Sequence, residues 1–193
     1  MSEKTDTGPG QLPMVEGSMY GATAYLTSYL ATFLLVAIFE GKRFVGDLIE
    51  GAGWIFYNAQ FVGIEQRAPP GSEGTVDVPS INYLTGTGLE RVGTETIVLP
   101  AVVYHALPVL AFLGAGYFLT RSFGVTEIVT GAKVGGSIVF GIIFLSLGGA
   151  FIFEVADVLG PNRFQALALA GILYPVVCGA TGGILSAWVE STR

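Results

Sequence analysis

Four long apolar stretches constrain this chain more than any other feature of its sequence. They run from Met19 to Phe39, Ile97 to Leu119, Val134 to Phe153 and Ala166 to Val189, and none contains Asp, Glu, Lys or Arg. An α-helix rises about 1.5 Å per residue, so about 20 such residues cross a hydrocarbon core about 30 Å thick. A soluble protein of 193 residues cannot bury four helices of this kind. We therefore expect an all-α, polytopic membrane protein that crosses the cell membrane several times.

The few charged residues are mostly acidic. There are 15 Asp plus Glu against 9 Lys plus Arg, and only three of the basic residues are lysine. Such a balance is typical of proteins that work at very high salt, where screening weakens the repulsion between carboxylates. We interpret it as the mark of a halophilic protein from a salt-loving microbe, with an ordinary acidic membrane protein as the alternative. A net charge of −6 argues against a nucleic-acid partner, which needs a basic face.

The remaining sequence divides around the four spans. Residues 1–18 predict a flexible tail without a cleavable signal, and residues 19–189 predict one transmembrane domain. We place its helices at 19–39, 97–119, 130–153 and 166–189, the third beginning near Thr130, before its uncharged part. Four spans put both termini on one side of the membrane. Lys and Arg near the helix ends divide five against four, which leaves the orientation open.

The connection after the first span has two halves. Over residues 44–62 apolar side chains recur at helical spacing, with Asp47 and Glu50 mostly on the other side. This predicts an amphipathic interfacial helix, lying flat on the membrane or folding back against the bundle. Residues 63–96 predict a polar loop, with a short extended piece around 75–84. The side chains expected to offer an interfacial contact surface are Trp54, Phe56, Tyr57, Asn58, Gln60 and Phe61.

Small residues form stripes on the third and fourth spans. Stripes of this kind let transmembrane helices approach closely where no hydrophobic force drives their association. We predict that they pack these two helices together within one chain, with self-association through the same faces as the alternative. The predicted packing residues are Gly131, Gly135, Gly179, Gly183 and Ala187.

One histidine, His105, lies in the second span between Pro100 and Pro108, where we expect a kink or a local loosening. An ionisable group inside a membrane is a candidate for proton relay or substrate contact. Together with Tyr104 and Lys133 it forms our candidate intramembrane polar site. The alternative is structural: the imidazole bonds to a carbonyl that a proline has freed, and Lys133 extends to the interface.

Motifs of enzymes and metal proteins are missing from the sequence. It contains no HExxH, no phosphate-binding GxxxxGK[ST] and no GxSxG, and one histidine cannot build a histidine-rich metal site. Cys178 is the single cysteine, so an intrachain disulfide is impossible. We expect no catalytic residue, no metal and no cofactor.

The segment Gly53-Trp54-Ile55-Phe56-Tyr57-Asn58-Ala59-Gln60-Phe61-Val62, with the acidic, lysine-poor composition and four spans, resembles an uncharacterised family of four-helix membrane proteins from haloarchaea. The resemblance implies membrane location and organism type, and no activity. We therefore expect a scaffold or accessory subunit of a membrane complex, whose partner is another membrane protein or a second copy. The alternative is a transporter or channel component that acts as a homo-oligomer.

Overall fold

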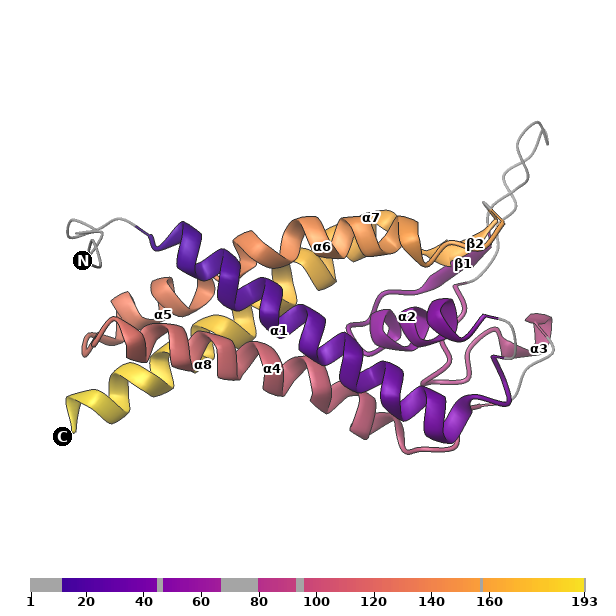
Figure 1. The fold of residues 1–193 in the computed structure, drawn as a ribbon, viewed down its shortest axis with the longest axis horizontal. Helices are drawn as coiled ribbons and strands as arrows, with labels where there is room; N and C mark the ends of the chain where they lie inside the picture. Colours follow the sequence, from indigo (N-terminus) through magenta and orange to yellow (C-terminus); the bar gives the residue numbers. More distant parts are fainter. Residues whose placement is uncertain (1–11, 45–46, 67–79, 93–95, 157, 193) are drawn as a thin grey trace, which may run out of the picture.

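Four helical rods lie side by side in the computed structural model, which describes residues 12–44, 47–66, 80–92, 96–156 and 158–192 (Figure 1). All four are long and apolar enough to cross a membrane, which confirms the predicted helical class and the number of spans. The rods comprise Met14–Glu40, Ala101–Ser122, Ile128–Ile152 and Arg163–Ser191.

The first rod consists of α1 (Met14–Leu35) and a π-helical turn, η1 (Val36–Glu40). It begins five residues before the span expected at 19–39, because Pro13 occupies the N-cap and Glu16 lies in the first turn. A carboxylate there is favoured by the partial positive charge of the helix N-terminus. The described part of the expected 1–18 tail is therefore mostly helix, and residues 1–11 lie outside the described part.

The second rod is α4 (Ala101–Ser122), and both of its prolines are accommodated. Pro100 stands at the N-cap, outside the helix, where its missing N–H removes no helical hydrogen bond. Pro108 lies inside α4 and is buried, and the helix continues through it to Ser122. Pro100 therefore causes no break within the second span.

The third rod is interrupted where α1 crosses it. It comprises α5 (Ile128–Gly136) and α6 (Val139–Ile152), with a turn at Ser137 and Ile138 between them. A β-carbon added at Gly17 or Gly21 of α1 would overlap the backbone of these two residues. Glycine on α1 thus allows the close crossing of the two backbones at this turn.

The fourth rod changes its helical type along its length. It consists of α7 (Arg163–Gln165), the π-helix η2 (Ala166–Leu173) and α8 (Tyr174–Ser191). The Asn162 side-chain oxygen caps the start of this rod by accepting a hydrogen bond of 2.6 Å from the backbone N–H of Gln165. Pro175 lies in the first turn of α8. Because proline has no N–H to donate, the change from π-helix to α-helix falls where a backbone bond is already lost.

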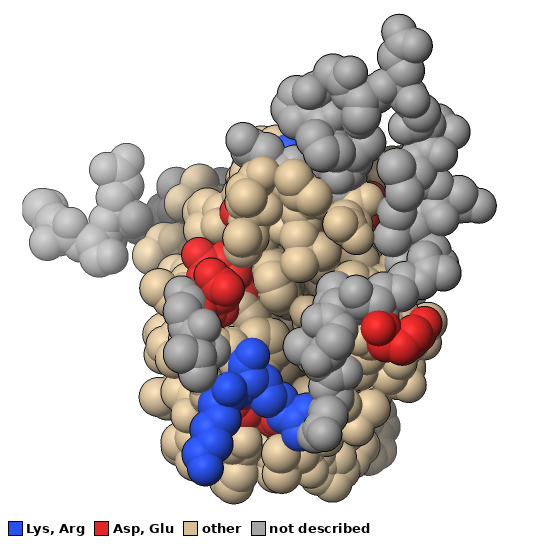
Figure 2. Space-filling view, turned by 90° about the vertical axis from the view of Figure 1, so that its right-hand side faces the viewer, with Lys and Arg blue, Asp and Glu red and all other residues tan. Residues whose placement is uncertain are grey.

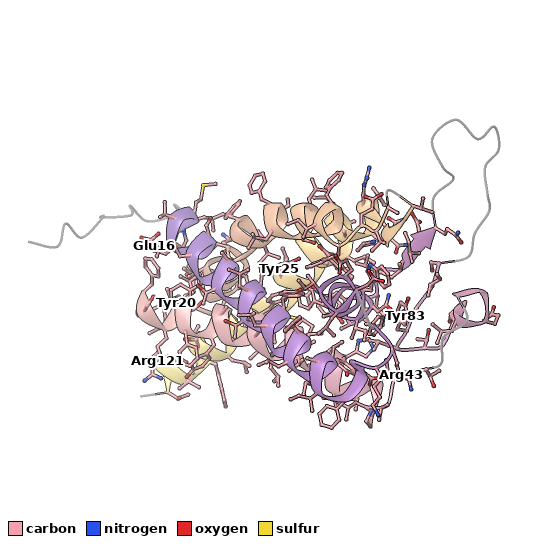
Figure 3. The ribbon with its side chains drawn as sticks, turned by 45° about the vertical axis from the view of Figure 1, so that its right-hand side comes forward. Glu16, Tyr20, Tyr25, Arg43, Tyr83 and Arg121 are labelled. Atoms are coloured by element: carbon pink, nitrogen blue, oxygen red, sulfur yellow. The ribbon has the colours of Figure 1, made fainter. Side chains whose placement is uncertain are left out.

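The two ends of the bundle differ. At the terminus end lie Met14, Ser191 and the short link from Ser122 to Ile128, with Glu16 and Arg121 nearby (Figures 1 and 3). At the loop end lie Arg43 and Tyr83, together with the connections that hold α2 (Leu48–Asn58), β1 (Ile64–Gln66), α3 (Leu89–Val92) and β2 (Leu159–Pro161).

A small sheet ties the two connections of the loop end together. β1 pairs antiparallel with β2, and Glu65 lies opposite Gly160. The Gly63 N–H donates to the Gln165 side-chain oxygen at 2.8 Å, which adds a side-chain bond to the pairing. The described part of the expected 63–96 loop thus contains β1 and α3, and residues 67–79 and 93–95 lie outside it.

Seen from the loop end, basic side chains gather near one edge of the molecule (Figure 2).

Candidate functional site

Helix α2 is inserted into the bundle near the loop end (Figure 1). Every residue from Gly51 to Gln60 is buried by protein. Gly51 lies against the ring of Phe44, and Gly53 lies against the ring of Phe153, so closely that neither glycine has room for a β-carbon. Two arrangements were expected for residues 44–62, flat on the membrane or folded back against the bundle. The structure has the second, and α2 lies inside the bundle rather than on its surface.

This placement differs from the expected interfacial contact surface. Trp54, Phe56, Tyr57, Asn58 and Gln60 are 0–5% exposed, whereas Phe61 is 62% exposed. Part of the segment 44–62 does form a helix, α2, but the aromatic side of this helix packs against other helices and not against the membrane surface. Five of the six expected contact residues are therefore core residues of this chain.

Hydrogen bonds fix the aromatic side of α2 to the middle of the bundle. The Tyr57 hydroxyl donates to the Ser146 carbonyl oxygen of α6 and lies 3.1 Å from the Tyr25 hydroxyl of α1. The Trp54 indole N–H donates to the Phe153 carbonyl oxygen at 2.8 Å. These bonds satisfy polar atoms that would otherwise be costly to bury in a membrane protein.

The C-terminal end of α2 holds the loop that follows. The Asn58 side-chain amide donates to the Val62 carbonyl oxygen at 2.8 Å, and its oxygen accepts from the Tyr83 N–H at 2.7 Å. Burial raises the pKa of Tyr83 to about 12, so its phenol is neutral at physiological pH. Gln60 donates to the Phe56 carbonyl oxygen at 3.2 Å, and its own oxygen has no partner among the described residues.

His105 belongs to this α2 terminus rather than to a polar channel. Its Nδ1 lies 2.8 Å from the Ala59 carbonyl oxygen, and the Tyr174 hydroxyl donates to the same oxygen at 3.4 Å. The ring of Phe61 stacks on the imidazole with 5.1 Å between centroids. Phe61 has a φ of 61°, a left-handed conformation that is strained for a bulky residue. The imidazole therefore meets a carbonyl of α2, and not one freed by Pro100 or Pro108.

The three residues of the expected intramembrane polar site are not brought together. Tyr104 is buried and turned toward Glu40, while its neighbour His105 contacts Ala59. Lys133 lies on α5 near the terminus end and is exposed, whereas Tyr104 and His105 lie near the loop end of α4 (Figure 1). Tyr104, His105 and Lys133 therefore do not form one polar site in this structure.

Glu40 is a buried acid that sequence reasoning missed. It is 0% exposed, and one carboxylate oxygen accepts from the N–H groups of Val98 and Leu99 at 2.7 and 3.2 Å. The other oxygen pairs with the Arg43 Nε at 3.1 Å. Glu40 immediately follows the first uncharged stretch and reads as an interfacial charge, so no local signal marked it. Its contacts join the end of the first rod to the start of α4.

The small residues of the third and fourth spans face one another. The Cα of Gly183 approaches the Gly131 carbonyl group, and Gly135 approaches both Gly179 and Gly183. The β-carbon of Ala187 lies against Gly131. These faces are therefore occupied by packing of α5 against α8 within the chain.

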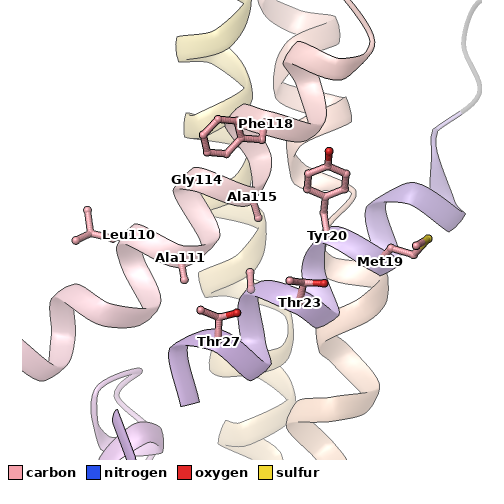
Figure 4. Close-up of a pocket in the computed structure, with 10 residues that line it drawn as sticks. Met19, Tyr20, Thr23, Thr27, Leu110, Ala111, Gly114, Ala115 and Phe118 are labelled. Atoms are coloured by element: carbon pink, nitrogen blue, oxygen red, sulfur yellow. The ribbon is translucent and has the colours of Figure 1, made fainter. Parts of the chain in front are cut away.

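A groove of about 480 Å³ opens on the outer side of the bundle between α1 and α4 (Figure 4). None of the described residues that line it is charged. Its polar groups are the hydroxyls of Tyr20, Thr23 and Thr27 on α1, opposite Gly114 and Phe118 on α4. A β-carbon at Gly114 would meet no atom within 4 Å, so the groove is open there.

Nearly the whole chain matches one known protein family. Residues 1–190 match a family of unknown function, DUF7978. The chain belongs to DUF7978. The searches found no match among curated proteins and none among solved structures.

Membership of DUF7978 agrees with the expectation of a family of unknown function and brings no activity with it, and the haloarchaeal origin stays a prediction. The described residues of this family member contain no group of three His, Cys, Asp or Glu side chains that could hold a metal ion. The arrangements that the described residues of this DUF7978 protein do offer are the buried α2, the outer helix faces and the groove.

Proposed function

We propose that the protein acts by interaction, as a scaffold or accessory subunit of a membrane complex, and has no enzymatic activity of its own. The observation that carries this proposal is the burial of α2 inside the bundle. Tyr57, Phe56 and Ile55 are fully buried and fill the space between the rods near the loop end. A bundle with a packed interior suits a rigid body that presents its outer surface to a partner.

The transporter alternative has less support. A transported substrate needs a path near the bilayer midplane, often beside interrupted helices. Inside this bundle two polar side chains bond to protein: the Tyr57 hydroxyl donates to the Ser146 carbonyl oxygen, and the Ser146 hydroxyl donates to the Ala166 carbonyl oxygen at 2.8 Å. These bonds are the contacts expected of a static core.

The outer face of α6 is our proposed partner surface. Phe144, Gly148 and Ile152 stand four residues apart on one stripe, and the two large side chains are 79% and 70% exposed. A β-carbon at Gly148 would meet no atom within 4 Å. Large side chains flanking an open glycine can interlock with a helix of a neighbouring membrane protein or a second copy.

Copurification from native membranes in mild detergent tests this proposal. We expect a stoichiometric partner or a defined homo-oligomer with the natural chain, and its loss in Gly148→Leu. Gly114→Leu is the matched control, because Gly114 is equally open but lies on α4. Substrate or ion flux in liposomes that His105→Phe abolishes while assembly stays intact would overturn the scaffold in favour of the transporter.

We also propose that the protein works at high salt, in an organism of the haloarchaeal kind. The support is the excess of 15 acidic over 9 basic residues in a lysine-poor chain. Screening by salt then offsets the repulsion between carboxylates. Thermal unfolding in detergent should shift upward when KCl is raised from 0.2 to about 2 M, and a midpoint that does not rise would contradict the proposal.

A further inference from the structure

We draw no further inference here: the strongest candidate, the side-chain cluster of Phe61, His105 and Tyr174 at the C-terminal end of α2, bonds within the chain to the Ala59 carbonyl oxygen and belongs to the site already described.

Discussion

The Cα of Gly183 on α8 faces the carbonyl oxygen of Gly131 on α5 so closely that no β-carbon fits between them. Backbone contact of this kind replaces the hydrophobic force that lipid removes from helix association. The same relationship recurs one turn along, where Gly135 meets Gly179. The terminus-end half of the bundle therefore depends on glycine at these positions.

Gly183→Ala should destabilise the protein by about 1–3 kcal/mol, because the added methyl group forces α5 and α8 apart. Gly148→Ala is the matched control, since its β-carbon meets open space and alanine favours the helix. Thermal unfolding in one detergent measures both. Equal unfolding midpoints for the two variants would mean that the close contact contributes nothing.

Glu40→Leu should cost about 2–4 kcal/mol, because the N–H groups of Val98 and Leu99 lose their acceptor and Arg43 loses its carboxylate. Glu40→Gln keeps an oxygen for the two N–H groups and should cost less. Unfolding in detergent ranks the three proteins. A Glu40→Leu protein as stable as the natural chain would show that packing alone holds α4 to the first rod.

His105→Ala should destabilise the α2 terminus more than His105→Phe does. Phenylalanine keeps a ring for Phe61 to stack on and loses only the bond to the Ala59 carbonyl oxygen, about 1 kcal/mol. Alanine loses both contacts. Limited proteolysis near Phe61 measures local opening. Equal cleavage of the two variants would contradict a role for the ring contact.

Sequence alone predicted what periodicity and length determine. The four spans follow from uncharged length, and the stripes containing Gly131 and Gly183 mark helices that can approach closely. The position of α2 did not follow, because an aromatic, amphipathic segment is equally suited to a headgroup boundary and to a gap between helices. Deciding between them requires knowing that Gly53 meets Phe153, which is a contact between distant parts of the chain.

The burial of Glu40 could not be predicted from the sequence either. Glu40 reads as an interfacial acid because its partners at Val98 and Leu99 lie 58 and 59 residues away. Thr23 and Thr27 look like ordinary span residues until their neighbours are known. Only the diverging walls of α1 and α4 leave their hydroxyls facing a groove (Figure 4).

Both termini should lie on one side of the membrane, with α2 and the sheet of β1 and β2 at the other. Cysteines introduced at Ser191 and Thr85, each in a Cys178→Ser background, report the two ends, since both positions are exposed. In sealed vesicles of one orientation, a membrane-impermeant maleimide should label one of them, and the other only after permeabilisation.

Thr126→Cys provides the internal reference, because Thr126 is exposed in the link between α4 and α5 at the terminus end. It should label together with Ser191→Cys in every preparation, whichever side faces outward. Labelling of Thr126→Cys together with Thr85→Cys instead would place an odd number of crossings between Thr126 and Ser191. That result would remove one of the two rods that lie between these residues, and with it the packing of α5 against α8.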